Sequence, residues 1–396
     1  MEPGKRAGRQ GVSVAHILGE MLAVLALAGS AYMLLAAILV GKYRTRPVPV
    51  LAHAPGVTLL KPLHGAEPRL DDNLGAALRQ DYPGSVQTIF GVSRSGDPAL
   101  AAVARLRRAH PGHDIAVVVD PARHGSNAKV SNLMNMAAHA RHDVIVLADS
   151  DMGVPPSHLA RVVAELEQPG VGAVTCLYHG RGDAGFWSRF AAAGISWQFL
   201  PGVVVGRALG LAQPCMGATI ALRAETLQAI GGFGSLADTL ADDHALGAAV
   251  AATGRRVGAP PILLAHGSAE ASLVELARRE LRANATVREI EPAGFAGSLL
   301  TYPLPLALGA LAFLGATPLA LSVAAVATVA RFAVALSADH AAGARTAPLA
   351  WLPARDLASF GLFVASFFVR SVDWRGARLT LLGEGAIADA IMEPAE

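Results

Sequence analysis

Short apolar runs alternate with amphipathic stretches through the middle of the chain, from about residue 47 to 292. The apolar runs predict β-strands at 57–60, 87–92, 115–119, 144–148, 171–177 and 218–222. Helix-period patterns fill the gaps at 98–109, 128–140, 156–166, 242–253 and 271–289. Strands that alternate with helices indicate βαβ units. The pattern therefore predicts one α/β domain with a mostly parallel sheet flanked by helices.

Longer apolar stretches flank this region. Residues 21–41 carry no charge and reach the roughly 20 residues that cross a bilayer, which favours an uncleaved anchor over a signal peptide. Residues 295–330 also carry no charge and predict two closely spaced spans. The shorter stretch 357–369 fits either a third span or an interfacial helix. The expected organisation is an anchor at 1–46, a catalytic domain at 47–292 and a membrane region with a tail at 293–396.

Composition supports a membrane protein. Of 396 residues 53% are hydrophobic and 16% charged, and the mean hydropathy is +0.41. A net charge of +2 argues against a nucleic-acid partner. Two cysteines, Cys176 and Cys215, exclude a disulfide framework and suit a cytoplasmic catalytic region. Lys and Arg are equally frequent on both sides of the first span, so charge gives no orientation.

The most informative polar residues are Asp149 and Asp151, which follow the predicted strand at 144–148. Ligands of open α/β sheets bind at the carboxyl ends of the strands. Two acids one residue apart at that edge indicate a hard divalent cation that bridges a phosphate-bearing ligand. The alternative is a polar turn that closes the strand.

Three further acids stand at strand ends or helix starts. Asp97 precedes a predicted helix, where it either caps the helix or contacts a ligand. Asp242 and Asp243 open another helix. Capping is again the simpler interpretation, but two adjacent acids exceed what one cap needs, and a carboxylate at a pocket edge suits a general base.

Several basic residues are candidates for binding an anion. Lys61 closes the first strand, and Lys129 lies in the first turn of a helix, where backbone N–H groups favour phosphate. Arg279 and Arg282 lie one helical turn apart in the basic helix before the apolar run. That helix is either an arginine clamp for a diphosphate or a solvated or membrane-facing surface. His179 is a candidate for touching an acceptor or is a polar loop residue.

Six or more motifs in a fixed order resemble one family. Residues 57–65 read VTLLKPLHG and 80–83 read QDYP. GDPA follows at 96–99, NAKVSNL at 127–133 and ADSD at 148–151, then GGF at 231–233, LADD at 240–243 and RELR at 279–282. This order resembles the ceramide glucosyltransferase family, glycosyltransferase family 21, and within it the bacterial branch associated with hopanoid biosynthesis.

The resemblance implies a GT-A fold and a role for each matched residue. Asp97 matches the aspartate that helps to bind the nucleotide, and Asp149 the one at the metal and nucleotide sugar, with Asp151 extending that motif. Asp243 matches the catalytic base, with Asp242 beside it at the pocket. Arg279 and Arg282 match an arginine motif near the diphosphate, in which Ala283 replaces a family tryptophan.

The implied reaction is inverting transfer of a sugar from UDP-glucose or UDP-N-acetylglucosamine to the hydroxyl of a membrane lipid, either ceramide or a hopanoid polyol, with Mg²⁺ or Mn²⁺. The implied location is the bacterial inner membrane, with the catalytic domain facing the cytoplasm. Two alternatives stay open. One is a processive polysaccharide synthase, and the other is a non-catalytic membrane protein that binds nucleotide sugars.

Overall fold

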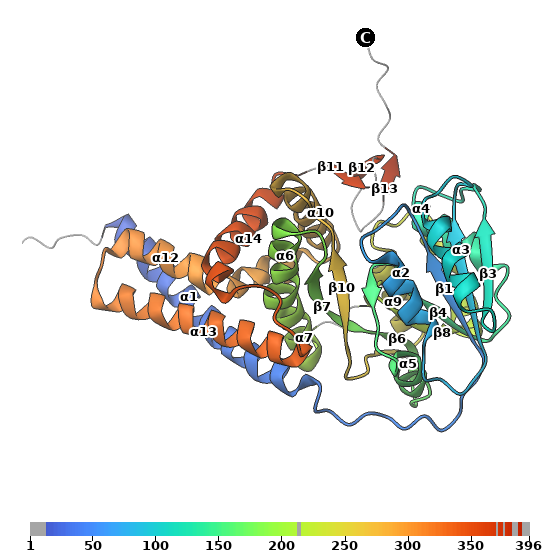
Figure 1. Ribbon diagram of the computed structural model, residues 1–396. Coiled ribbons are helices and arrows are strands. Elements are labelled where there is room, and N and C mark those ends of the chain that lie inside the picture. The colour runs from blue at the N-terminus through green and yellow to red at the C-terminus, as the bar shows by residue number, and fades with distance from the viewer. Residues whose placement is uncertain (1–12, 212–214, 370, 375–376, 382–386, 390–396) are drawn as a thin grey trace, which may run out of the picture.

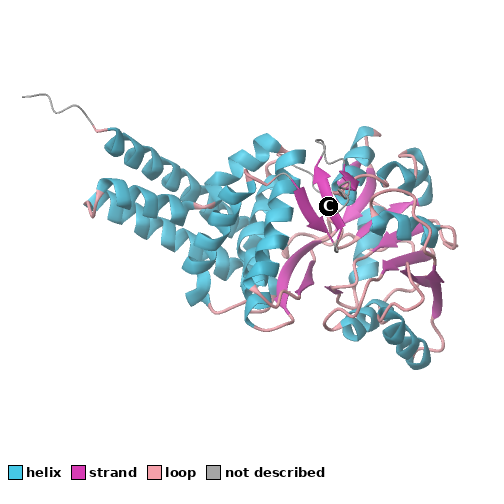
Figure 2. Cartoon of the chain, turned by 90° about the horizontal axis from the view of Figure 1, so that it is seen from above, coloured by secondary structure: helices cyan, strands magenta, loops and turns pink. Residues whose placement is uncertain are grey.

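A computed structural model describes residues 13–211, 215–369, 371–374, 377–381 and 387–389. A seven-stranded sheet forms the centre of the globular body (Figures 1 and 2). Its order is β3 (Asp114–Val119), β2 (Val86–Val92), β1 (Val57–Pro62), β4 (Val144–Leu147), β8 (Ile220–Arg223), β6 (Val171–Thr175) and β9 (Arg256–Gly258). Only β8 runs against its neighbours, which confirms the predicted mostly parallel sheet.

Helices cover both faces of this sheet, which explains why its strands are continuous apolar runs. Val57 and Leu59 of β1 pack with α2 (Leu70–Leu78) and α5 (His158–Leu166). Leu60 packs on the opposite face with α4 (Ala128–Ala137) and α9 (Asp242–Ala252). The edge near β2 is covered by α3 (Ala99–Ala109), and α8 (Ala224–Ala229) follows β8.

The single strand predicted at 171–177 is wrong. The chain leaves the large sheet at Thr175, and Leu177 begins β7 (Leu177–Gly182), which belongs to a second sheet with β10 (Leu263–Ser268) and β5 (Met152–Gly153). Because the apolar run continues through the fully buried Cys176, the hydrophobic pattern hides the change of sheet. His179 consequently lies inside β7 and not in a loop after it.

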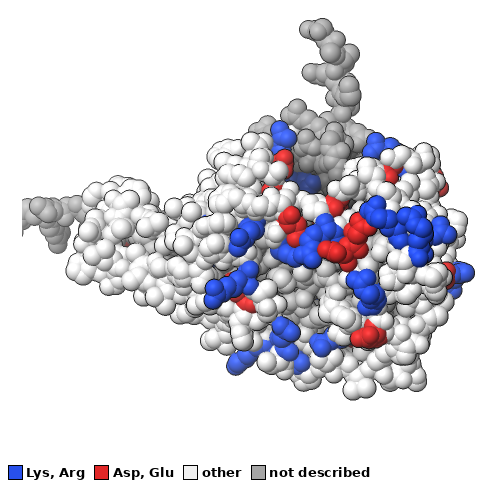
Figure 3. All heavy atoms as spheres, in the orientation of Figure 1, with Lys and Arg blue, Asp and Glu red and all other residues white. Residues whose placement is uncertain are grey.

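Apolar helices project from one end of the globular body, and in the space-filling view this part is almost free of charged residues (Figures 1 and 3). Two helices in the described chain are long and apolar enough to cross a membrane, α1 (Val14–Tyr43) and α13 (Pro318–Ala342). The helical segment 292–301 and α12 (Pro303–Leu314) are bent by 67° relative to each other. They form a third candidate crossing if this bent pair is counted as one span. The pair comprises α11 (Pro292–Gly297), η3 (Ser298–Thr301) and α12.

The C-terminal helix α14 (Leu352–Ser366) has 15 residues, too few to span a bilayer alone, and it does not meet the criteria for a span. The structure therefore does not support 357–369 as a third span. By contrast, α13 extends twelve residues beyond the predicted limit at 330. The extension contains the buried Arg331. Its Nε and Nη2 atoms donate hydrogen bonds of 2.7 and 2.8 Å to the carboxylate of Asp356 on α14, which neutralises the charge.

Part of the predicted catalytic domain packs on the membrane helices. α6 (Phe186–Gly194), the π-helix η1 (Ile195–Phe199) and α7 (Leu200–Ala208) follow β7, and Trp197 and Leu200 share a core with Val40 of α1 and Ala335 of α13. α10 (Leu273–Ile290) packs against α14.

The remaining elements are the short helices η2 (Phe233–Leu236) and η4 (Leu349–Trp351) and a small antiparallel sheet of β11 (Ser371–Trp374), β12 (Ala377–Leu381) and β13 (Ile387–Asp389).

Candidate active site at the carboxyl edge of the sheet

The D-x-D turn after β4 is held by its backbone carbonyl groups. The carbonyl of Asp149 accepts a 2.8 Å hydrogen bond from Lys61 Nζ, and that of Ser150 accepts one of 3.2 Å from Asn73. The carbonyl of Asp151 accepts a 2.9 Å bond from the backbone N–H of Gly267. Because three separate elements fix the main chain, the turn is rigid without using either carboxylate. The carboxylates are left for other contacts, of which Asp149 makes one with Lys129.

Lys61 has a different place from the one its sequence position suggested. Its side chain is fully buried, and its hydrogen bond goes to the backbone of Asp149. Burial lowers the pKa of Lys61 to about 8, against the opposing effect of Asp149, Asp151 and Glu67. The buried ammonium group of Lys61 therefore holds the main chain of the D-x-D turn. This arrangement gives no support to direct contact between Lys61 and a nucleotide sugar.

Three site residues converge on Gly217. A Cβ atom added there would lie 3.1 Å from Lys129 Nζ, 3.2 Å from Asp149 Oδ2 and 3.5 Å from Asp243 Oδ2. The backbone N–H of Gly217 donates a 2.8 Å hydrogen bond to Asp243 Oδ2, and the N–H of His244 donates one of 2.8 Å to Oδ1. A side chain at this position would enter the space that these groups share, and they would have to move apart to accept it.

Lys129 links the acids of this cluster. Its Nζ lies 3.0 Å from Asp149 Oδ1 and 3.6 Å from Asp242 Oδ2. Burial opposes the charge of Lys129, but Asp149, Asp242 and Asp243 together outweigh burial and raise its pKa. Burial raises the pKa of Asp242, opposed by Lys129, and Asn127 also contacts this acid at 3.4 Å. Asp242 is thus held by neighbours, whereas Asp243 faces Gly217.

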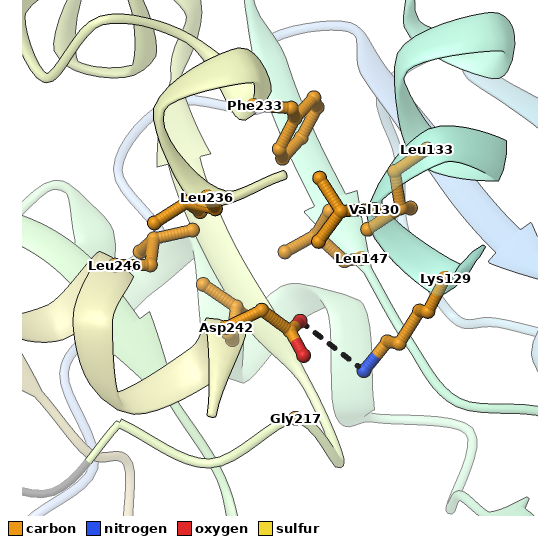
Figure 4. Close-up of a pocket in the computed structure, with 10 residues that line it drawn as sticks. Lys129, Val130, Leu133, Leu147, Gly217, Phe233, Leu236, Asp242 and Leu246 are labelled. Atoms are coloured by element: carbon orange, nitrogen blue, oxygen red, sulfur yellow. Dashed lines mark ion pairs between the residues drawn. The ribbon is translucent and has the colours of Figure 1, made fainter. Parts of the chain in front are cut away.

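A small pocket opens beside this pair. Lys129, Asp242 and Gly217 form its polar end, and the dashed line in Figure 4 marks the ion pair. Apolar side chains from β4, β8, α4, η2 and α9 form the rest, namely Val130, Leu133, Leu147, Ile220, Phe233, Leu236 and Leu246. An apolar wall lowers the local dielectric, which strengthens the electrostatic interactions at the polar end.

Asp151 fits a divalent cation. Its Oδ1 is buried and has no hydrogen-bond donor among the described residues, and its Oδ2 lies 3.5 Å from Nε2 of His266 on β10. Nδ1 of His266 likewise has no partner there. The described chain contains no ready-made cluster of three or more His, Cys, Asp or Glu ligands. Two carboxylates suffice for Mg²⁺ or Mn²⁺, however, when substrate phosphates complete the coordination.

Asp97 uses one of its two carboxylate oxygens to hold the start of a helix. Its Oδ1 accepts 2.9 Å hydrogen bonds from the backbone N–H groups of Ala99, at the start of α3, and of Gly65, after β1. Its Oδ2 is buried without a hydrogen-bond donor among the described residues and lies 4.0 Å from His64 Nδ1. One oxygen thus caps the helix, and the other remains for a ligand.

The basic helix is α10. Arg279 lies 2.5 Å from Glu270 Oε1 and 3.4 Å from Ser268 Oγ. Burial works against its charge, but Glu270 more than compensates and raises the pKa of Arg279. Arg282 is half-buried one turn later, and Ala283 is exposed. Arg279 is therefore a permanent cation anchored beside the end of β10.

His179 is buried and contacts the carbonyl of Gly180 at 3.2 Å. Burial chiefly lowers its pKa, and its charged neighbours are Arg181, Asp339 and Arg44, which are not acids of the cluster. The ring of the adjacent Tyr178 instead lies 5.2 Å from the ring of His266, which contacts Asp151. The structure therefore puts Tyr178 and not His179 beside the aspartates.

Sequence reasoning missed Gly217, Tyr178 and His266. Gly217 stands three residues before Ile220, the first residue of β8, and a glycine before a strand is too common to single out. Tyr178 and His266 lie on strands of the second sheet. Because the hydrophobic pattern did not separate this sheet from the first, it gave no reason to place either residue at the site.

Comparisons with known proteins agree with this architecture. The model of glycosyl transferase family 21 matches residues 21–387. The ceramide glucosyltransferase of Gibberella zeae is 30% identical over 138 residues, which cover 31% of this chain and 26% of that protein. Ceramide glucosyltransferase 1 of Caenorhabditis elegans is 24% identical over 213 residues, 54% of this chain and 45% of that protein. The chain thus spans less than half the length of these curated relatives.

Among solved structures, the mannosyltransferase PcManGT of Pyrobaculum calidifontis, in complex with GDP-Man and Mn²⁺, superposes with a TM-score of 0.51 at 24% identity. The match covers 89% of this chain and 99% of that one, and it shows a shared fold of the GT-A type. The assignment made from the ordered motifs is confirmed, because the family model extends over most of the sequence: the chain belongs to glycosyltransferase family 21.

Proposed function

We propose that this protein transfers a sugar from a UDP-sugar to the hydroxyl group of a membrane lipid, with inversion at the anomeric carbon. The observation that carries the proposal is the convergence of Asp149, Lys129 and Asp243 on Gly217, at the carboxyl edge of the sheet. The same body is joined to helices long enough to cross a membrane. A water-soluble donor and a bilayer acceptor therefore have separate approaches to one site.

Each site residue has a chemical task in this proposal. Asp243 accepts the proton of the lipid hydroxyl as the oxygen attacks the anomeric carbon, and its own orientation is fixed by Gly217 and His244. Arg279 and Arg282 offset the negative charge that grows on the departing diphosphate. Asp97 accepts a hydrogen bond from the nucleotide through its unpaired oxygen.

Asp149 and Asp151 are the residues that would hold Mg²⁺ or Mn²⁺. The bound cation would neutralise the diphosphate leaving group. Lys129 supplies a fixed positive charge next to Asp149 and lessens the repulsion between Asp242 and its neighbouring acids.

The donor is UDP-glucose or UDP-N-acetylglucosamine, and the acceptor is ceramide or a hopanoid polyol. This choice rests on the similarity to ceramide glucosyltransferases and on the ordered motifs. The proposed location is the bacterial inner membrane, with the site on the cytoplasmic side, where nucleotide sugars are made. The two or three candidate spans within the described residues give little support to a polymer channel, which disfavours a processive synthase.

The test is a transfer assay with the full chain in membranes. Each labelled UDP-sugar is offered with ceramide or bacteriohopanetetrol, with Mn²⁺ or with a chelator. We expect metal-dependent labelling of one lipid, and a loss of about 10²–10⁴-fold in kcat in Asp243→Asn with unchanged donor binding. Asp72→Asn on the exposed side of α2 is the matched control. Donor binding without transfer to any lipid would point to the non-catalytic alternative, and elongating products would point to a polysaccharide synthase.

A further inference from the structure

Three rings form a line that starts at the D-x-D turn. His266 lies 3.5 Å from Asp151 Oδ2. The ring of Tyr178 lies 5.2 Å from that of His266, and the ring of Phe199 stacks on that of Tyr178 at 5.2 Å with an interplanar angle of 25°. These three residues, His266, Tyr178 and Phe199, are called the aromatic line below. They come from β10, β7 and η1, so tertiary folding alone brings them together.

One end of the aromatic line lies in the site. Tyr178 is partly buried, and its ring lies 5.2 Å from that of His266, which contacts Asp151 of the D-x-D turn. Burial first, and then Asp243, raises the pKa of Tyr178, so the phenol stays neutral. A ring at this place contributes an apolar face and a polar tip without adding charge.

The other end of the line belongs to the membrane body. Phe199 is the last residue of the π-helix η1, and 39% of it is exposed. The preceding turn is fixed by α13: Trp197 Nε1 donates a 3.0 Å hydrogen bond to Asp339, and the carbonyl of Trp197 accepts one of 3.0 Å from Arg331. Single π-turns are frequent at functional sites. Here the turn holds an exposed ring at the junction between spanning helix and catalytic sheet.

An acceptor that stays in the bilayer must meet two requirements. Its hydroxyl has to reach Asp243, and the apolar part next to that hydroxyl has to remain covered as it leaves the hydrocarbon. Aromatic rings suit such a boundary because they offer a large apolar face at low entropic cost. The aromatic line is the feature of the described chain that joins the aspartates to the membrane helices through contacting rings.

We propose that Phe199 and Tyr178 form one wall of the acceptor subsite, against which the lipid segment next to the reactive hydroxyl packs, with Phe199 setting acceptor affinity. This inference rests on the proposed function, since it concerns the acceptor of the same site. The occupant is a hydroxylated lipid with long hydrocarbon chains that enters from the bilayer. Tyr178 touches the acceptor near the reacting oxygen, and Phe199 touches it nearer the membrane.

The chain offers a matched control. Phe186 opens α6, thirteen residues earlier in the same helical segment, and 51% of it is exposed. Its ring contacts Trp187, Phe190 and Trp351, and it makes no ring contact with Tyr178. Phe186→Ala and Phe199→Ala therefore remove the same exposed ring, but only the second change removes a member of the aromatic line.

The kinetic experiment uses the full chain in nanodiscs. We expect Phe199→Ala to raise KM for the lipid about tenfold, to change kcat less than about threefold, and to leave donor KM and acceptor-independent donor hydrolysis unchanged. Phe199→Tyr restores the lipid KM. Tyr178→Phe keeps the ring and retains lipid affinity, whereas Tyr178→Ala loses it. Equal lipid KM values for Phe199→Ala and Phe186→Ala would overturn the inference while leaving the proposed function intact.

A second measurement does not depend on turnover. A ceramide with a photoactivatable group near its head is crosslinked to the wild-type chain in nanodiscs, and the labelled peptides are identified. We expect labelling within residues 177–182 and 195–199, reduced at least fivefold by Phe199→Ala and unchanged by Phe186→Ala. If the lipid labels these segments but no sugar is transferred, the proposed reaction fails and the acceptor wall stands. Labelling confined to other segments refutes the wall whatever the turnover.

Discussion

Lys129 places its ammonium nitrogen 3.0 Å from Oδ1 of Asp149, so the nearest charged partner of the first D-x-D acid is a cation of the protein itself. The same nitrogen lies 3.6 Å from Asp242, and Asp243 also acts on it. One lysine therefore balances three acids contributed by β4 and α9. The arrangement explains how so much negative charge is tolerated beside an apolar pocket.

Replacing this lysine has a defined consequence. Lys129→Met should lower the free energy of unfolding by about 1–2 kcal/mol, because it leaves partly buried acids without their counter-ion, and solvent screens part of the effect. Adding Asp242→Asn to the same chain should restore at least half of the loss, since one of the acids is removed with the cation. Thermal unfolding of the purified chain in detergent measures both values. A single variant as stable as the wild type would contradict the idea that Lys129 balances the cluster.

Gly217 tests the geometry of the site without changing any charge. In Gly217→Ala the new methyl group would lie 3.1 Å from Lys129 Nζ and 3.2 Å from Asp149 Oδ2, so both side chains must shift by a few tenths of an ångström. Transfer should fall about tenfold or more, because small displacements of catalytic groups are costly. Gly361→Ala, where nothing lies within 4 Å, is the control. Unaltered transfer in Gly217→Ala would show that the groups do not act together.

Acid should weaken the fold through His158. Burial, with a smaller contribution from Lys61, lowers the pKa of this histidine to about 3, and its ring contacts Thr219 Oγ1 at 3.1 Å. The unfolded chain binds the proton below about pH 6.5, while the folded chain does not until about pH 3. The free energy of unfolding therefore falls as the pH is lowered from about 6.5 towards 3, with the His158 contribution lost amounting to about 2 kcal/mol at pH 5.

The check for His158 is the difference in melting temperature between pH 7.5 and pH 5. His158→Gln keeps a partner for Thr219 but cannot titrate, so its melting temperature should fall less on acidification than that of the wild type. His53→Gln, at an exposed loop position, should behave as the wild type does. Parallel pH dependence in all three proteins would rule out this histidine as a source of acid sensitivity.

Arg331 and Asp356 form a buried, bidentate ion pair between α13 and α14. Arg331→Met should destabilise the chain by about 3–5 kcal/mol, because Asp356 is left buried without its counter-charge. The double variant Arg331→Met, Asp356→Leu should be much closer to the wild type, since both charges leave together. Unfolding in the same detergent compares the two. A double variant less stable than the single one would indicate that the charges serve a purpose beyond balancing each other.

Local patterns were sufficient to predict much of the fold. β1 and β4 are continuous buried runs, and the acids Asp149 and Asp151 follow β4 as the pattern indicates. The helix starts at Ala128 and Asp242 were also visible, since polar residues precede or open each apolar face. These features depend on neighbouring residues, which is why a single sequence reveals them.

The remaining features depend on partners distant in sequence. Arg331 interrupts an uncharged stretch, so the sequence suggests that the span ends before it. The helix α13 nevertheless continues, because the ion pair with Asp356 offsets the cost of burying the charge of Arg331. Lys61 at a strand end looks like a ligand contact until the carbonyl of Asp149, 88 residues away, is seen to receive its hydrogen bond. The apolar run through Cys176 likewise carries no sign of the two different strands that β6 and β7 join.

That junction has a mechanical consequence. Cys176 is the only residue between the strand that ends in the large sheet and the strand that leads to the membrane helices. A connection of one buried residue has almost no freedom to swing or stretch. The height of Asp243, the proposed catalytic base, above the membrane helices is therefore fixed by the fold. Among lipids that enter the site, those whose hydroxyl projects to that fixed height would be glycosylated, and those whose hydroxyl lies deeper in the bilayer would be left unmodified.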